Sequence, residues 1–268
     1  MAFIKVNDVV LHARAGREEH GRPLVFINSL GTDYRIWHKV AHDLRGANFR
    51  FLFHDKRGHG LSDIGDVPYS IEDHVADVAA LMDHYRMKDA IICGISVGGM
   101  IALALSAARP DLVGGLILCN TAHKLGTDAA WNLRIAKVAS SGLSHIWGQI
   151  ERAWFTADFR KNHPDEVRGI RNMVIRCHQG GYVGTCMAIR DADYTEAAKN
   201  VSVPTLVVGA SQDGSTPPDV VKGMAEIIPG ADYHEMPDAA HMTCIEQPEK
   251  LAGLIKGFAE RHGLMADG

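Results

Sequence analysis

Ser96 lies in a Gly-x-Ser-x-Gly motif, which can present a serine hydroxyl as a nucleophile. The apolar run at residues 91–93 precedes the motif, and a stretch of small residues follows it. This order indicates a strand, a sharp turn and a helix, whose first N–H groups favour developing negative charge. In so tight a turn, side chains in place of Gly94 and Gly98 would collide with neighbouring backbone. The motif therefore predicts a nucleophilic serine at the start of a helix.

A serine hydroxyl is a poor nucleophile at neutral pH, so it needs a general base and a carboxylate that orients the base. Asp213 follows an apolar run at 205–209, and His241 follows a second predicted strand at 231–236. Because the carboxyl ends of parallel strands share one edge of a sheet, these residues and Ser96 are expected to converge there. We predict a catalytic triad in which His241 takes the proton of Ser96 and Asp213 orients His241.

Other residues near these positions carry the same functional groups. His234 lies inside the predicted strand at 231–236, where a structural role is favoured. Asp219 is expected on the following helix, and Asp238 is too near His241 in sequence to orient it. For Ser96, the alternative is a plain helix cap behind a strand.

Acyl transfer at a serine also needs two backbone N–H donors aimed at the developing oxyanion. The N–H of Val97, directly after the nucleophile, is one predicted donor. The other is expected from the loop at 28–33, which follows the apolar run at 23–27, and we assign it to Leu30.

The elements that position these residues follow from the apolar patterning of the chain. Strands are predicted at residues 3–6, 9–13, 23–28, 49–54, 90–93, 116–119, 205–209 and 231–236. Helices are predicted at 36–44, 99–108, 131–139, 167–177 and 249–261, and another begins after Ser70 with a capping-box pattern. Alternating strands and helices predict an α/β fold with a mostly parallel, doubly wound sheet.

This alternation stops between about residues 123 and 198, where Arg, Trp and Met are frequent and strand-like apolar runs are missing. We therefore expect a core formed by residues 1–122 and 199–268, with residues 123–198 inserted as a helical cap. An insertion at the carboxyl ends of the strands would cover the ligand crevice.

The composition of the 268-residue chain excludes several other classes of function. A net charge of -4 without a Lys/Arg run gives no basis for nucleic-acid binding. No segment approaches the roughly 20 apolar residues of a membrane span, and the N-terminus lacks a signal-peptide pattern. Five scattered cysteines without a Cys-x-x-Cys pair favour a reduced, cytoplasmic setting. The fifteen histidines show no metal-binding spacing, so no metal is expected, and hydrolysis through a serine nucleophile requires no organic cofactor.

A further motif, His54-Asp55-Lys56-Arg57-Gly58-His59-Gly60-Leu61-Ser62, resembles the D-x-R-G-x-G-x-S loop of the α/β-hydrolase family. With the serine motif and the Ser–Asp–His order, it extends that resemblance over essentially the whole chain. The charged residues of this loop look catalytic in type, but a structural network near the site is the favoured interpretation. Epoxide hydrolases and haloalkane dehalogenases are disfavoured because they have Asp at the position of Ser96.

Within that family the chain most resembles the 3-oxoadipate enol-lactonases. The resembling stretches lie at 28–32, 119–122, 131–135, 155–160 and 188–193. One departure is Asn28, which stands where many relatives have a histidine. The change keeps a backbone donor but requires different hydrogen bonds inside the loop.

The resemblance implies hydrolysis of a small enol-lactone that carries an acetate arm, in the β-ketoadipate pathway of aromatic catabolism. It leaves open whether that pathway starts from protocatechuate or catechol. Arg134 is the first candidate to bind the substrate carboxylate, because arginine can grip a carboxylate with two hydrogen bonds. Trp131, three residues earlier, would face the same side of a helix and line the pocket. The alternatives are a surface arginine and a packing tryptophan.

Two further functions compete with this one. The first is a broad carboxylesterase or a carbon–carbon bond hydrolase on the same scaffold. The second is a ligand receptor that has kept the fold without catalysis, which a complete triad disfavours.

Overall fold

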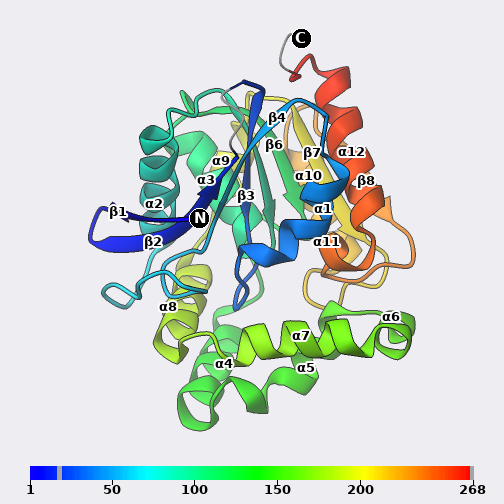
Figure 1. Ribbon diagram of the computed structural model, residues 1–268. Helices are drawn as coiled ribbons and strands as arrows, with labels where there is room; N and C mark the ends of the chain where they lie inside the picture. Colours follow the sequence, from blue (N-terminus) through cyan, green and yellow to red (C-terminus); the bar gives the residue numbers. More distant parts are fainter. Residues whose placement is uncertain (17–19, 266–268) are drawn as a thin grey trace.

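An eight-stranded sheet forms the centre of the computed structural model, which describes residues 1–16 and 20–265 (Figure 1). The strand order is β1-β2-β4-β3-β5-β6-β7-β8, with β2 antiparallel to β1 and β4 and all other neighbours parallel. The strands are β1 (Ala2–Val6), β2 (Val9–Ala15), β3 (Arg22–Ile27), β4 (Phe49–His54), β5 (Ala90–Ile95), β6 (Val113–Cys119), β7 (Thr205–Ala210) and β8 (Asp232–Met236). The predicted α/β class and mostly parallel sheet are confirmed.

The central strands are buried on both faces, which explains why they appear in the sequence as continuous apolar runs. All residues of β5 and β7 are buried, and Cys93 lies in this core as predicted. β6 begins three residues before its predicted start. Gly114 and Gly115 hide that start, because glycine is depleted in strands.

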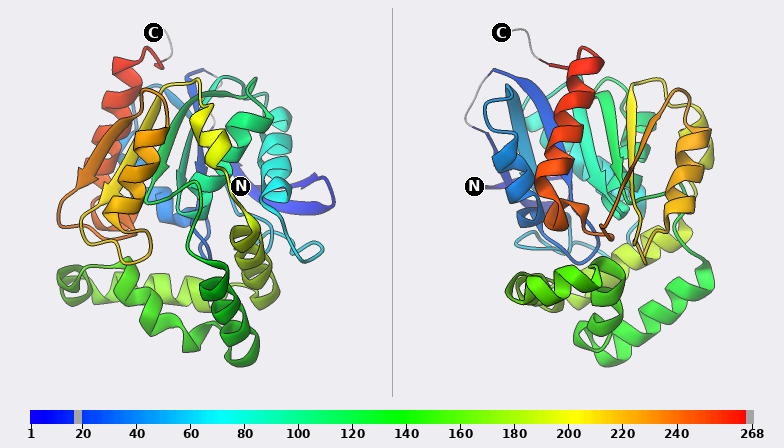
Figure 2. Two further views of the ribbon diagram at one scale, coloured as in Figure 1. Left: turned by 180° about the vertical axis from the view of Figure 1, so that it is seen from behind. Right: turned by 90° about the vertical axis from the view of Figure 1, so that its right-hand side faces the viewer.

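Helices cover both faces of the sheet. Outside the β6–β7 connection they are η1 (Tyr34–Trp37), α1 (His38–Asp43), α2 (Ile71–His84), α3 (Val97–Ala108), α10 (Pro218–Ile227), α11 (Thr243–Glu246) and α12 (Pro248–Arg261). α1 and α12 lie together on one face, and α2, α3 and α10 lie on the other (Figure 2). The helix predicted at 36–44 is divided, because the Asp33 side chain accepts from the Arg35 N–H and starts a tight 3₁₀ turn.

The start of α2 has the predicted capping box. The Ser70 hydroxyl accepts from the Asp73 N–H at 3.2 Å, and the Asp73 carboxylate accepts from the Ser70 N–H at 2.7 Å. These bonds satisfy two donors that a helix end leaves free. Ile71, Val78 and Met82 are buried along one face of the helix, as their spacing predicts.

The connection between β6 and β7 contains only helices among its regular elements. They are α4 (Asp128–Ser141), η2 (Leu143–His145), α5 (Trp147–Trp154), α6 (Ala157–Asn162), α7 (Pro164–Ile175), α8 (Gln179–Asp191) and α9 (Thr195–Lys199). α4 to α8 lie together at one end of the sheet, whereas α9 packs against α3 and α10 (Figure 1). The division of the chain at residues 122 and 199 stays a prediction. No described helix is long and apolar enough to cross a membrane.

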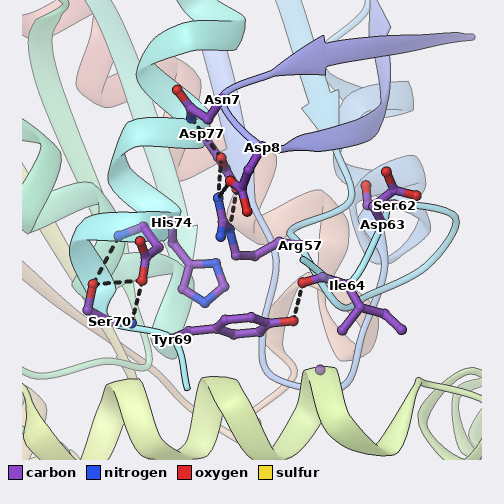
Figure 3. Close-up of polar contacts among 12 residues, drawn as sticks. Asn7, Asp8, Arg57, Ser62, Asp63, Ile64, Tyr69, Ser70, His74 and Asp77 are labelled. Atoms are coloured by element: carbon purple, nitrogen blue, oxygen red, sulfur yellow. Dashed lines mark hydrogen bonds and ion pairs between the residues drawn. The ribbon is translucent and has the colours of Figure 1, made fainter. Parts of the chain in front are cut away.

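The loop after β4 is anchored by a buried ion pair between Arg57 and Asp77 of α2 (Figure 3). The Arg57 guanidinium donates to both Asp77 oxygens at 2.7 and 2.8 Å, and to Asp8 at 3.0 Å. These carboxylates raise the pKa of Arg57 further above its usual value. A Cβ on Gly58 of the same loop would meet the backbone of Gly181 in α8. Only glycine therefore permits this contact with the helical layer, the group of helices from α4 to α8.

Asp55 in the same loop also has a structural role. Its carboxylate accepts from the Tyr34 N–H and the Leu61 N–H, both at 2.9 Å, and lies 2.8 Å from His12 Nδ1. This side chain therefore joins β2, η1 and its own loop. The expected structural network near the site is present.

We predict that Arg57→Ala lowers the free energy of unfolding by about 3–5 kcal/mol, because it leaves the buried Asp77 carboxylate without its partner. Urea denaturation measures the change. Arg109→Ala is the matched control, because Arg109 binds two carboxylates at an exposed site and should cost much less. Equal losses for the two variants would contradict the structural role given to Arg57.

Candidate active site

Ser96 occupies the sharp turn between β5 and α3 and has backbone angles of φ 57° and ψ -125°. Positive φ is uncommon for a serine and marks a strained turn. A Cβ on Gly94 would meet the Gly98 carbonyl, and a Cβ on Gly98 would meet the Ile27 carbonyl. Both glycines are therefore required by close backbone contacts, as predicted.

His241 and Asp213 form a buried pair at the same end of the sheet. His241 Nδ1 lies 2.9 Å from Asp213 Oδ2 and 3.1 Å from Oδ1, and both residues are almost fully buried. Because an ionised carboxylate only accepts hydrogen bonds, Nδ1 carries the proton in this pair. Nε2 is thereby left as the basic nitrogen of His241.

The Asp213 carboxylate is held by a ring of donors. It accepts from Ser215 N–H at 2.7 Å, Thr216 N–H at 2.9 Å and Asn120 Nδ2 at 3.0 Å. These bonds fix the orientation of the carboxylate and, through it, of the imidazole.

Asn120 is a site residue that sequence reasoning missed. Its side-chain oxygen accepts from Thr243 Oγ1 at 2.9 Å, and its carbonyl accepts from Thr216 Oγ1 at 3.1 Å. It therefore connects the end of β6 to the loops that hold Asp213 and His241. The available signal was a polar residue directly after the predicted strand at 116–119, the same signal that identified Asp213.

A cavity of about 410 Å³ brings most of the predicted site residues together. Ser96, His241 and Leu30 line it from the core, and Trp131 and Arg134 line it from α4. Asp213 and Val97 are not among the lining residues. Asp213 contacts His241 from the buried side, and Val97 is the first residue of α3, where an N–H has no acceptor within the helix.

The charged side chains of the cavity are all basic. Arg134 and Lys137 of α4 line it, and no lining residue is acidic. The Arg134 guanidinium carbon lies 5.6 Å from the centre of the Trp131 ring, a cation–π distance. Within the part of the chain that the structure describes, neither Arg134 nor Lys137 forms an ion pair. The cavity is thus suited to a small anionic ligand.

The competing residues lie where the sequence predicted them, outside the cavity. His234 is an exposed residue of β8, Asp219 is on α10, and Asp238 is exposed. Among the described residues, no cluster of three or more His, Cys, Asp or Glu side chains could hold a metal ion.

A family model described as "Serine aminopeptidase, S33" matches residues 19–248 of the chain. The 3-oxoadipate enol-lactonase 2 of Acinetobacter baylyi is 30% identical over 258 residues, which cover 96% of both chains. This protein belongs to the α/β-hydrolase family. Membership of this family supports hydrolysis as the type of reaction that the protein catalyses.

Two solved structures align with this α/β-hydrolase over nearly its whole length. The enol-lactonase from Burkholderia xenovorans LB400 aligns with a TM-score of 0.93 and 33% identity, over 97% of this chain and 100% of that one. A thermophilic esterase from Thermogutta terrifontis aligns with a TM-score of 0.91 over 98% of this chain and 100% of that one. At 24% identity, the second likeness shows the fold alone.

In this α/β-hydrolase, the end of α5 is attached to the loops of both Asp213 and His241. The Ala153 carbonyl accepts from the Gly214 N–H at 3.2 Å, and the Trp154 carbonyl accepts from the Met242 N–H at 3.1 Å. The Trp154 ring stacks on the His241 ring with centroids 6.0 Å apart. The helical layer therefore helps to position the pair formed by Asp213 and His241.

Glu246 of α11 joins the segment after α5 to the loop before His241. Its carboxylate accepts from the Thr156 N–H at 2.8 Å, from Thr156 Oγ1 at 2.9 Å and from the Ala240 N–H. Burial raises the pKa of Glu246 above its usual value. One carboxylate thus connects the start of α6 to the residue before His241.

We predict that Glu246→Ala lowers the free energy of unfolding by about 3 kcal/mol, because it leaves two part-buried backbone donors without an acceptor. Glu246→Gln keeps one acceptor oxygen and should lose less. Chemical denaturation compares both with Glu249→Ala, a change at an exposed neighbour in sequence. A loss at Glu246 no larger than that at Glu249 would show that the connection has no energetic weight.

Proposed function

We propose that this α/β-hydrolase converts 3-oxoadipate enol-lactone to 3-oxoadipate through an acyl-enzyme formed on Ser96. The observation that carries the proposal is the cavity, which combines Ser96 and His241 with Arg134 and Lys137 and has no acidic lining residue. A small lactone with a carboxylate arm matches that combination of nucleophile and unpaired cations. The names of the enol-lactonase relatives support the same substrate.

In the proposed first step, Ser96 Oγ bonds to the lactone carbonyl carbon while its proton passes to His241 Nε2. Asp213 holds the imidazole in the required tautomer and stabilises the imidazolium that forms. The carbonyl oxygen becomes an oxyanion, which the N–H groups of Leu30 and Val97 stabilise.

In the second step, the bond between the carbonyl carbon and the ring oxygen breaks and an enolate leaves. The enolate takes a proton from His241 and becomes a ketone within the opened substrate, which stays bound to Ser96 as an ester through the former lactone carbonyl. His241 then removes a proton from water, which attacks the ester and releases the new carboxylate. His241 passes the proton taken from water to Ser96 Oγ as that oxygen leaves, and the proton first taken from Ser96 stays on the product ketone, so the cycle balances without a cofactor.

The carboxylate arm gives the site its proposed selectivity. Arg134 can bind a carboxylate with two parallel hydrogen bonds, and Trp131 supports its guanidinium plane. Lys137 lies three residues further along α4 and lines the same cavity, so it adds positive charge without needing fixed geometry. The reaction would supply 3-oxoadipate in the β-ketoadipate pathway of aromatic catabolism.

We predict that Ser96→Ala reduces kcat by about 10⁴-fold or more while the fold is retained, because the covalent intermediate can no longer form. Stopped assays with the purified lactone measure the loss. Ser106→Ala in the same helix is the control, because among the described residues its hydroxyl bonds only the Leu103 carbonyl. Near-normal turnover by Ser96→Ala would refute the nucleophile.

The relative rates at which the wild-type enzyme hydrolyses two substrates discriminate between the candidate functions. An enol-lactonase opens the lactone much faster than p-nitrophenyl acetate. The reverse order would favour a broad carboxylesterase, and tight ligand retention without turnover would favour a receptor.

We predict that Arg134→Ala raises the KM for the carboxylated lactone about 10- to 100-fold, the loss expected for a charged hydrogen bond. The KM for the methyl ester of the same lactone should change little, because that ester has no anionic arm. Arg152→Ala on α5 is the control, because Arg152 is exposed and does not line the cavity. Equal changes for acid and ester would contradict the carboxylate contact.

A further inference from the structure

Lys56 is a buried lysine whose ammonium binds backbone carbonyls directly before Leu30, the proposed oxyanion donor. It follows β4, is 2% exposed, and donates to the carbonyls of Asn28 and Ser29, both at 2.9 Å. Both carbonyls belong to the loop after β3. Among the described residues, no carboxylate forms an ion pair with Lys56.

The Ser29 carbonyl and the Leu30 N–H belong to one planar peptide unit. In a trans peptide the C=O and N–H point in opposite directions, so fixing the oxygen also fixes the direction of the N–H. The hydroxyl of Thr32 donates to the same Ser29 oxygen at 2.9 Å. Ser29 and Leu30 line the cavity, and within the described residues the Leu30 N–H has no acceptor.

We propose that Lys56 is a positioning residue for the oxyanion hole: its ammonium holds the Ser29–Leu30 peptide so that the Leu30 N–H faces the cavity. The positive charge also polarises that peptide, which makes the N–H a stronger donor as the oxyanion develops. This inference rests on the proposed function, because it assigns the oxyanion to Leu30.

The two buried carbonyls need a donor, but a neutral donor would serve them, so fold stability does not account for the charge of this side chain. A buried ammonium without a carboxylate partner carries a desolvation penalty, and an apolar side chain of similar length avoids it. A cation next to a site where negative charge develops stabilises that charge in the transition state. The Asn28 side chain also ties this loop internally by donating to the Thr32 carbonyl.

Burial lowers the pKa of Lys56 to about 7, so its charge changes in the working range of most enzymes. Its ionisable neighbours come from several elements: His54 at the end of β4, Asp55, Arg57 and His59 in its own loop, Asp33 before η1, His74 on α2, and Cys177 before α8. The three histidines are buried, and their pKa values are lowered by that burial, so they stay neutral when Lys56 titrates.

The sign of the pH effect follows from this pKa. Below about pH 7 the ammonium is present and the peptide is held and polarised. As pH rises through that value, Lys56 loses its proton and its charge, so kcat should fall on the alkaline side. A purely structural tie would not create this limb.

The test compares wild type, Lys56→Met and Lys56→Gln on the enol-lactone and on p-nitrophenyl acetate between pH 5 and about 9. Lys56→Met should reduce kcat about 10²-fold, the scale of a lost oxyanion donor, with KM within about threefold. Its alkaline limb should disappear on both substrates. Lys56→Gln keeps a donor without the charge, so it should lose less activity and also lack the limb. Lys222→Met, an exposed change on α10, is the control.

A second measurement does not depend on turnover. The amide resonance of Leu30 in an isotope-labelled sample should shift with a midpoint near pH 7 in wild type and in Ser96→Ala. It should stay constant in Lys56→Gln, which also serves if Lys56→Met fails to fold. A Leu30 resonance that is the same in wild type and in Lys56→Gln at every pH overturns the proposal.

The two failures are distinguishable. If wild type hydrolyses the ester but not the lactone, the proposed substrate is wrong, and the Lys56 comparison is read from the ester. If wild type opens the lactone and Lys56→Met retains both its kcat and its alkaline limb, the substrate stands and the role of Lys56 is wrong. If neither substrate reacts, the Leu30 resonance decides the role of Lys56.

Discussion

The contact between Gly98 and the carbonyl of Ile27 is the constraint on which the site depends. It lets the first turn of α3 approach the end of β3 so closely that no side chain fits between them. The loop after β3 therefore begins next to the nucleophile turn, and Leu30 reaches the cavity that Ser96 lines. Without this approach, the N–H groups of Leu30 and Val97, the two proposed oxyanion donors, would lie too far apart to act on one oxygen. The strained φ of Ser96 is maintained by the same packing.

A second level of order comes from the helical layer. Carbonyls at the end of α5 bind the loops of both Asp213 and His241, and Glu246 binds the segment that follows α5. The side chains of α4 that are proposed to bind the ligand belong to that same layer. Under the proposed function, substrate selection and alignment of the His241–Asp213 pair therefore depend on the same group of helices, although the residues involved are far apart in sequence. A shift of α4 and α5 would therefore alter both the cavity lining and the position of the His241–Asp213 pair.

Local sequence patterns were sufficient to predict the sheet class, the buried strands and the grouping of Ser96 with His241 in one cavity. Each of these depends on an apolar run and the polar residue that follows it, which is information held within a few residues. The contacts made by Asn120, Glu246 and Lys56 could not be predicted in this way, although Asn120 itself directly follows a predicted strand. Their partners lie 93, 90 and 28 residues away in the chain, and only the folded structure brings the groups into contact. The start of β6 was missed for a local reason, because Gly114 and Gly115 carry no strand signal.

The basic groups around the cavity have different tasks under the proposed reaction. A substrate carboxylate is charged before, during and after the reaction, so a contact with Arg134 stabilises ground state and transition state alike. Such uniform binding strengthens substrate association without accelerating the chemical step. The lactone oxygen gains its charge only as Ser96 attacks, so a donor aligned by Lys56 acts mainly on the transition state. The first cation lies on α4 and the second follows β4, so binding and catalysis draw on separate charges of one fold.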